Sequence, residues 1–310
     1  MTEITAAMVK ELRERTGAGI SDCKKALVES EGDYDRAIDI LREKGLAAAA
    51  KKAGRIASEG LVTAVISPDG KNGVIAEINS ETDFVAKNQE FRNFVSDVAG
   101  QALASDAFTV EELLAEKWQK DGSMTVSDAL TGMIARVGEK ISIRRFEKFS
   151  IMGAGVLVNY IHGGGRVCVM IELGSDVADD ALIEAGKNVC MQIAAMSPAF
   201  ISRADVSEEF MSKEKEILTQ QALNEDKPKP ANIIEKMVVG RLEKNLKEMC
   251  LLEQEYVKDQ ETTVRKYLES VGLSLGCAVT VRKMARYETG EGIEKREENF
   301  AEEVSKAMTT

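Results

Sequence analysis

The segment LVTAVISPDGKNGVIAEINSE, residues 61–81, aligns without gaps with VLVNYIHGGGRVCVMIELGSD, residues 156–176. Both segments have the pattern of a strand, a glycine-containing turn and a second strand, and their apolar alternation agrees on both sides of the turn. The alignment places Val74 on Val169, Glu77 on Glu172 and Ser80 on Ser175, with Gly60 on Gly155 just before it. We therefore predict two copies of one β-hairpin unit.

The repeat continues beyond each hairpin. Helical patterns follow at residues 88–104 in the first copy and 178–196 in the second. Further on, Gly138 aligns with Gly276, and residues 141–146 and 279–284 then alternate as a third strand. A three-stranded antiparallel sheet packed on helices buries one sheet face. The predicted fold class is therefore α+β, with two repeated subdomains.

The alignment offset changes from 95 to 138 residues, which predicts an insertion of 43 residues between about 199 and 260. Segments 206–223 and 233–252 have a helical apolar period and flank a proline-containing stretch. This pattern indicates an antiparallel helical hairpin that projects from the second subdomain. Its apolar stripe has two interpretations, packing of the two helices on each other alone or an arm for oligomerisation.

The first fifty residues have the pattern of three short helices. Thr2 or Thr5 is available to cap the first helix, Ser21 or Asp22 the second, and Asp33 the third, which we expect to end at Gly45. A helical linker over 47–53 would follow. We predict a three-helix bundle like a ubiquitin-associated domain, with Leu12 in its core and Ile20 exposed after two glycines.

These patterns divide the chain into four segments. Residues 1–54 form the docking bundle with its linker, and 55–150 the first core subdomain. Residues 151–290 form the second core subdomain, with the inserted arm at about 199–260. Residues 291–310 are the C-terminal segment.

Composition excludes several classes of protein. The 310-residue chain carries a formal net charge of −11, which disfavours non-specific binding to nucleic acid. The single histidine, His162, excludes a multi-histidine metal site, and the five cysteines form no CxxC pair. No apolar run reaches the ~18 residues of a membrane span. We expect a cytoplasmic protein with no cofactor, no bound metal and no membrane or nucleic-acid partner.

The hairpin tip of the second copy is a candidate contact site. His162 is followed by Gly163, Gly164, Gly165 and Arg166. A phosphate-binding loop leads into a helix N-terminus, whereas this loop leads into a strand, so that function is disfavoured. A flexible hairpin tip and a contact loop for a protein partner both remain.

Two basic pairs occupy equivalent third strands, Arg144–Arg145 and Arg282–Lys283. They are candidates for nucleic-acid contact. A basic pair on a strand edge is more often solvated or prevents edge pairing, which is the interpretation that we favour.

The stretch Thr82-Asp83-Phe84-Val85-Ala86-Lys87-Asn88 joins the first hairpin to its helix. In one interpretation Asp83 or Asn88 caps the helix and Phe84 belongs to the core. The matching stretch of the second copy, Val177-Ala178-Asp179-Asp180, has no aromatic residue. This difference within the repeat permits a second interpretation, a role for Phe84 beyond the fold.

Three blocks of sequence give the chain a resemblance to a known family. They are Lys10–Arg13 with Thr16–Gly19 and Asp22–Leu27, then Thr82–Lys87, and finally Gly290–Lys295. Over essentially its whole length the chain resembles bacterial elongation factor Ts, the guanine nucleotide exchange factor of elongation factor Tu.

The resemblance implies a set of partner contacts. Arg13 and Ile20 would dock the bundle on a helix of the partner's G domain. Thr82, Asp83, Phe84 and Val85 would intrude beside the nucleotide and disturb its Mg²⁺. The His162–Arg166 loop would meet a β-barrel domain. Residues 291–310 would form a C-terminal helical module whose helix, 298–308, returns to the G domain. The arm would support a homodimer or a two-plus-two complex.

One position departs from the family pattern, since Ser21 stands where the family often has a second apolar residue. The resemblance nevertheless implies an exchange factor, and the lack of the usual catalytic constellations in the sequence agrees with a protein that performs no covalent chemistry. Two other classes remain for comparison: an enzyme that uses His162 or a cysteine, and an adaptor that binds a helical peptide through its bundle.

Overall fold

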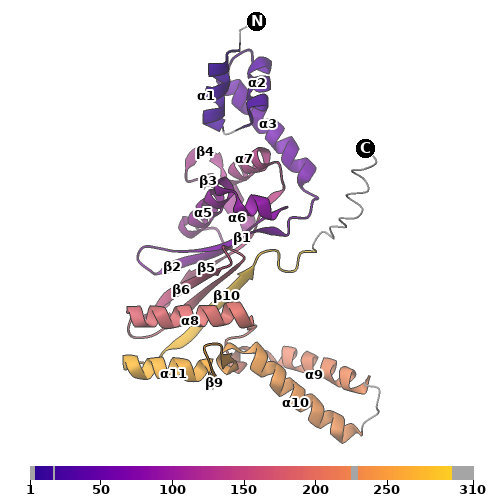
Figure 1. Ribbon diagram of the computed structural model, residues 1–310, viewed down its shortest axis with the longest axis vertical. Coiled ribbons are helices and arrows are strands. Elements are labelled where there is room, and N and C mark those ends of the chain that lie inside the picture. The colour runs from indigo at the N-terminus through magenta and orange to yellow at the C-terminus, as the bar shows by residue number, and fades with distance from the viewer. Residues whose placement is uncertain (1–3, 17, 225–229, 295–310) are drawn as a thin grey trace. The chain divides into compact units, whose positions relative to one another are not determined.

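The computed structural model describes residues 4–16, 18–224 and 230–294 (Figure 1). The chain divides into two compact units. Unit 1 comprises the chain up to Thr63, Ala76–Phe146 and the chain from Glu288 onward; unit 2 comprises Ala64–Ile75 and Glu147–Tyr287. Helices and small antiparallel sheets build both units, which confirms the α+β fold class.

The N-terminal bundle consists of α1 (Ala6–Thr16), α2 (Ile20–Glu29) and α3 (Tyr34–Lys52). Its core is formed by six buried residues: Val9, Leu12, Cys23, Ala26, Leu27 and Ala37. Thr5 accepts a hydrogen bond from the Met8 amide, and Asp33 caps α3 by accepting one from the Arg36 amide. The three-helix bundle and the core position of Leu12 are therefore confirmed; Thr2 lies outside the described residues.

Two predicted helix boundaries in the bundle are wrong. Gly19 is the N-cap of α2, which begins at Ile20 rather than after Ser21 or Asp22. Helix α3 does not end at Gly45 but continues to Lys52. Gly45 is buried, and a Cβ there would lie 3.4 Å from Thr131 of α7 (Val126–Val137). The glycine therefore serves close helix packing, and the predicted linker is the last part of α3.

The first copy of the repeat contains a sheet with strand order β1-β2-β5. The bounds are β1 (Glu59–Ile66), β2 (Asn72–Ser80), α4 (Asp83–Lys87), α5 (Gln89–Ala104), α6 (Val110–Ala115), β3 (Lys117–Trp118), β4 (Asp121–Thr125), α7 and β5 (Ile141–Ser150). The amphipathic helix α5 buries Phe91, Phe94 and Val95. The predicted helix and third strand are thus confirmed.

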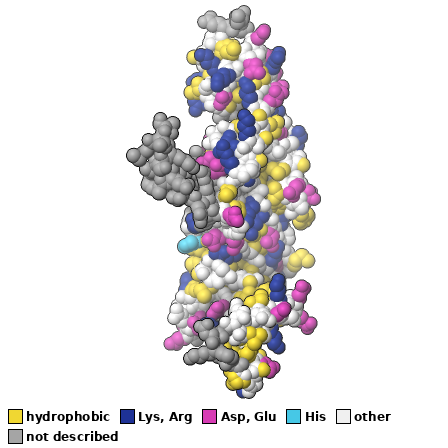
Figure 2. All heavy atoms as spheres, turned by 90° about the vertical axis from the view of Figure 1, so that its right-hand side faces the viewer, with side chains coloured by type: hydrophobic (Ala, Val, Ile, Leu, Met, Phe, Trp, Pro, Cys, Tyr) yellow, Lys and Arg dark blue, Asp and Glu magenta, His cyan; other side chains and the backbone are white. Residues whose placement is uncertain are grey.

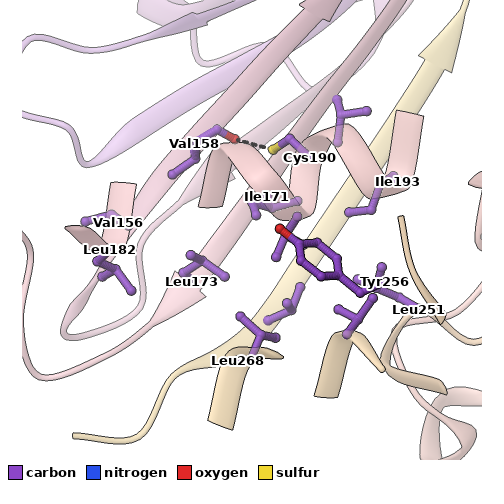
Figure 3. Close-up of a cluster of buried hydrophobic side chains, with 14 of the residues drawn as sticks. Val156, Val158, Ile171, Leu173, Leu182, Cys190, Ile193, Leu251, Tyr256 and Leu268 are labelled. Atoms are coloured by element: carbon purple, nitrogen blue, oxygen red, sulfur yellow. Dashed lines mark hydrogen bonds between the residues drawn. The ribbon is translucent and has the colours of Figure 1, made fainter. Parts of the chain in front are cut away.

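The second copy has the same topology, with strand order β10-β7-β6. Its bounds are β6 (Gly155–His162), β7 (Val167–Gly174), α8 (Asp180–Met196), β8 (Glu255–Tyr256), β9 (Asp259–Thr263), α11 (Val264–Leu275) and β10 (Thr280–Glu288). Figure 3 shows side chains of α8 and α11 packed with those of the strands in one apolar core. The Cys190 thiol donates to the Val158 carbonyl there at 3.6 Å.

The aligned glycines Gly60 and Gly155 explain why the repeat retains glycine at this point. Both have positive φ, +127° and +152°. A Cβ on Gly60 would lie 2.3 Å from the Ile78 carbonyl oxygen, and one on Gly155 would lie 2.2 Å from that of Leu173. No side chain fits this close approach of backbone to backbone.

A second, smaller hairpin also repeats, although the sequence patterns did not predict it. Strands β3 and β4 pair Lys117 with Thr125, and β8 and β9 pair Glu255 with Thr263 in the same register. Each strand is too short to show an alternating pattern.

The insertion forms a helical hairpin of α9 (Glu208–Leu223) and α10 (Ala231–Met249), flanked by short 3₁₀ turns, Arg203–Asp205 and Leu251–Glu253. Its helices share their own apolar cluster: Leu218, Ala222, Ile234, Val238 and the partly buried Leu242. Leu251, just beyond the hairpin, belongs to the core of the second copy instead. The predicted helical hairpin and the packing of its helices on each other are confirmed; oligomerisation stays a prediction.

The basic pairs lie on edge strands as predicted, β5 and β10, and Arg282 and Lys283 are 38% and 39% exposed, but the arginines are also partners of buried carboxylates, which the sequence did not predict. Glu77 is fully buried and accepts hydrogen bonds from Arg144 at 2.9 Å, Arg145 at 2.7 Å and the Gly290 amide at 2.8 Å. Burial favours a raised pKa for Glu77, but these donors outweigh it and lower the pKa. In the second copy Arg282 contacts Glu172 at 3.4 Å. Both pairs therefore use arginine to satisfy a buried carboxylate.

Candidate functional site

The turn that follows β2 carries the exposed aromatic residue of the first copy. Thr82 has extended backbone dihedrals and its hydroxyl accepts from the Val85 amide at 3.5 Å, which starts the short helix α4. Asn88 caps α5 by accepting from the Glu90 amide at 2.8 Å. Of the predicted caps, Asn88 is confirmed, whereas the N-cap of α4 is Thr82 rather than Asp83.

Phe84 points into solvent with 80% of its surface exposed, while Val85 and Ala86 beside it are buried. The prediction that Phe84 belongs to the core is therefore wrong. Exposing a whole phenyl ring forfeits the free energy of burying it, about 1.5–3 kcal/mol. The buried neighbours attach the turn to unit 1, so the ring is presented from an anchored segment.

Asp83 and Lys87 flank the ring with opposite charges. The Lys87 ammonium donates to the Asp83 carboxylate at 2.6 Å and lies 6.0 Å from the centre of the Phe84 ring. The hydrogen bond from Lys87 lowers the pKa of Asp83, so the carboxylate is ionised at neutral pH. The surface of the turn thus combines an apolar ring with an acceptor.

The N-terminal bundle offers a second candidate contact surface in unit 1. A groove of about 330 Å³ is lined by Ile4, Ala6, Val9, Lys10, Arg13, Ile20 and Lys24. Arg13 and Ile20 are thus brought together, and Ile20 is 58% exposed as predicted. Figure 2 shows side chains of both charges interspersed with hydrophobic ones over the N-terminal helices, whereas the charged residues that line the groove, Lys10, Arg13 and Lys24, are all basic. Such a mixture suits an apolar contact steered by positive charge.

The hairpin tip of unit 2 is a tight glycine turn. Gly163, Gly164 and Gly165 all have positive φ, and the Arg166 amide donates to the His162 carbonyl at 3.1 Å. The exposed His162 ring lies 3.0 Å from the Tyr160 hydroxyl through its Nδ1 atom. The loop leads directly into β7 rather than into a helix, as expected.

Sequence patterns missed one side chain that contacts the Thr82 turn. Glu139, which follows α7, accepts from both the amide and the hydroxyl of Thr82. The two residues are 57 positions apart, and no local periodicity connects them. The one sequence feature that could have indicated this contact is the difference between the aligned copies, which have Glu139 in the first and Cys277 in the second.

The described ranges contain no group of three His, Cys, Asp or Glu side chains arranged to hold a metal ion. Among the helices described, none combines the length and the apolar composition that crossing a bilayer requires.

Comparison with known proteins gives consistent matches. The family described as Elongation factor TS matches residues 81–291, which include the Thr82 turn and the hairpin tip. Elongation factor Ts of Clostridium perfringens strain SM101 is 56% identical over 303 residues, 98% of each chain. The Clostridium botulinum strain Alaska E43 protein is 54% identical over 305 residues, 98% of this chain and 99% of the relative. The Clostridioides difficile strain 630 protein is 52% identical over 308 residues, 99% and 100% respectively.

Proposed function

This chain belongs to the elongation factor Ts family, and from that premise we propose that it is a guanine nucleotide exchange factor in translation. It binds elongation factor Tu with GDP, disturbs the Mg²⁺ and nucleotide site and promotes GDP release so that GTP binds. It acts in the cytoplasm by protein binding, without covalent chemistry, a cofactor or direct contact with nucleic acid.

Exchange of this kind follows from thermodynamic linkage. A factor that binds the nucleotide-free partner more tightly than the loaded partner weakens nucleotide binding by the same factor. The chain therefore needs surfaces that recognise the partner and one element that the loaded nucleotide site cannot accommodate.

The single observation that carries the proposal is the exposed Phe84 on its anchored turn. Mg²⁺ requires near-ideal octahedral ligation, so a small displacement of its surroundings weakens it strongly. A rigid aromatic ring imposes such a displacement at low entropic cost, whereas a charged side chain would first lose its hydration. Thr82 and Val85 shape the turn, and Asp83 competes for a polar contact.

Other surfaces supply recognition. Arg13 and Ile20 dock the bundle on the G domain, with Ser21 reducing the apolar area there. The His162–Arg166 tip contacts the β-barrel domain of the partner. The arm supports a homodimer or a two-plus-two complex, and apolar side chains of α10, among them Val239, are exposed on it. The predicted helix at 298–308 lies outside the described residues.

An enzyme that uses a cysteine is the less supported alternative. Cys168 and Cys190 are buried, and burial raises the pKa of Cys168 to about 12 and that of Cys190 further still. A thiol with such a pKa is protonated at neutral pH and is a poor nucleophile. An adaptor that uses only the bundle would leave the exposed Phe84 without a role.

Release of fluorescent GDP from elongation factor Tu tests the proposal by stopped flow. The wild-type chain should accelerate release, and Phe84→Ala should slow the stimulated rate by about one to three orders of magnitude. This range corresponds to the roughly 2–4 kcal/mol of a lost aromatic anchor. Its melting temperature should stay near that of wild type, because the ring is exposed.

Phe108→Ala is the matched control, since Phe108 is 79% exposed in the same unit but outside the turn. It should leave the stimulated rate unchanged. A wild-type chain that does not accelerate GDP release would rule out the exchange function, and equal slowing by both variants would rule out the special role of Phe84.

A further inference from the structure

Two carboxylates, one from each segment, link the Thr82 turn to the residues that follow α7. Glu139 accepts from the Thr82 amide at 3.0 Å and from the Thr82 hydroxyl at 2.7 Å. In return, Glu81 accepts from the Lys140 amide at 2.6 Å. We call this four-residue arrangement, Glu81–Thr82 with Glu139–Lys140, the carboxylate clasp.

The clasp orients the hydroxyl that starts α4. A hydroxyl has one hydrogen and two lone pairs. Because Thr82 donates its hydrogen to Glu139, a lone pair remains to accept the Val85 amide at 3.5 Å. Glu139 therefore fixes the rotamer of the N-cap as well as its backbone.

Helix α4 depends on such support. It has only five residues, Asp83–Lys87, far fewer than an isolated helix needs in water. A charge-assisted hydrogen bond is about twice as strong as a neutral one. The Phe84 ring is 80% exposed, so packing against the core contributes little to its direction, and the cap and the clasp set the orientation of the backbone that carries it.

The second copy of the repeat lacks the clasp together with the aromatic residue. Val177 stands where the first copy has Thr82, and Cys277 stands where it has Glu139. There the Ser175 hydroxyl lies 3.1 Å from the Cys277 sulfur, and the carboxylate of this turn, Asp179, accepts from the Leu182 amide of its own helix α8 at 2.9 Å. The equivalent sheet and helices form without the clasp, so the fold of the repeat does not require it.

We propose that Glu139 is a positioning residue for nucleotide exchange, which holds the Thr82 turn so that Phe84 is presented to the partner's nucleotide site in one orientation. This role rests on the proposed function. Glu139 acts through Thr82 and Phe84, and its loss lowers the fraction of molecules whose ring is correctly placed.

Stopped-flow GDP release from elongation factor Tu tests this role with Glu139→Ala. The maximal stimulated rate at saturating chain should fall about tenfold, which corresponds to ~1.4 kcal/mol. The concentration for half-maximal rate should change by less than about twofold, because the bundle and hairpin tip still dock. Loss of stability alone would not separate these two quantities.

Variants at Thr82 supply the rescue. Thr82→Ser keeps the hydroxyl and should stay within about twofold of wild type, whereas Thr82→Val removes it and should resemble Glu139→Ala. Cys277→Ala, the equivalent position of the second copy, is the matched control and should not alter the rate. If Glu139→Ala fails to fold, the comparison of Thr82→Ser with Thr82→Val tests the positioning role. The criterion is again a lower maximal rate with an almost unchanged concentration for half-maximal rate.

A double-mutant cycle with Phe84→Ala gives the sharpest outcome. If Glu139 acts through the ring, Glu139→Ala should cause no further slowing in the Phe84→Ala background. A full additional tenfold loss there, or a wild-type rate for Glu139→Ala alone, overturns the positioning role while the exchange function stands. A wild-type chain without exchange activity overturns both.

Discussion

The two copies of the repeat each bury a glutamate at the same aligned position, but the two carboxylates have different hydrogen-bond partners. Glu77 of the first copy accepts from two arginines and the Gly290 amide at 2.7 to 2.9 Å, whereas Glu172 of the second accepts from one arginine and the Met152 amide, each at 3.4 Å. Arg144 and Arg282 occupy aligned positions, so this pair belongs to the shared fold. The additional donors of the first copy link the carboxylate to Gly290 and its neighbours. Shared positions thus build the fold, and differing positions indicate what each copy does.

The largest expected difference between the copies is in stability. Glu77→Ala should lower the free energy of unfolding by about 3 kcal/mol, because it leaves two partly buried guanidinium groups and the Gly290 amide without their fully buried carboxylate. Glu172→Ala should cost only about 1–2 kcal/mol, because Arg282 is 38% exposed and also donates to the Met152 and Ala154 carbonyls. Urea unfolding of both variants measures the difference. Equal losses would contradict the comparison.

The pH dependence of stability measures the contribution of the ionised Glu77 carboxylate separately. Its pKa in the folded chain is lowered, so its charged form stabilises the fold fully above its pKa in the unfolded chain, about 4.3. This contribution is lost as the pH falls through the lowered folded pKa. The difference in unfolding free energy between wild type and Glu77→Gln should be about 2–3 kcal/mol at pH 7 and should shrink below about pH 4. A difference that does not vary with pH would exclude an ionised Glu77.

The repeat was predictable from sequence to the extent that local patterns carry it. Apolar alternation and paired glycines predicted the hairpins, the third strands and the position of the insertion. The clasp of Glu139 with Thr82 and the contact of Glu77 with Gly290 join residues 57 and 213 positions apart. Such contacts depend on the completed fold, so no periodicity reveals them. Gly45 was misjudged because a glycine that ends a helix and one that packs against a neighbouring helix have the same sequence signal.

The helices that cover the two sheets differ in how closely they approach their neighbours. A Cβ on Gly186 of α8 would lie 2.6 Å from the Val158 side chain, whereas one on Gly100 of α5 would meet no atom within 4 Å. Gly186→Ala should therefore destabilise the chain by about 1–3 kcal/mol through overpacking. Gly100→Ala should stabilise it by about 0.5–1 kcal/mol through helix propensity. Thermal melts that shift in the same direction would refute this contrast.

The smallest effect on stability is expected from removal of the arm, which makes the second copy resemble the first. Residues 211–245 can be replaced by a short Gly/Ser linker that leaves Leu251 in the core of unit 2. Loop length changes closure free energy by only about 0.6 kcal/mol per doubling, so the sheets should melt almost as before. Any self-association seen by analytical ultracentrifugation should weaken.

Val239→Glu is the companion variant for the arm, because Val239 is exposed on α10 and outside the cluster that joins the two helices. It should weaken self-association while the arm stays folded. An early loss of the unit 2 core in the shortened chain would show that the arm is part of that core.

The contact at Gly45 has a mechanical consequence for unit 1. Helix α3 packs against α7 at Gly45, whose side chain is a single hydrogen. Helix α7 ends at Val137, two residues before Glu139. One side of α7 therefore bears the N-terminal bundle, and its end bears the turn that carries Phe84. Helix α7 therefore supports both surfaces. A force on the bundle and a force on the Phe84 ring are both transmitted to this one helix. The stiffness of α7, rather than the strength of either contact alone, determines how far the Thr82 turn moves when a force acts on the bundle.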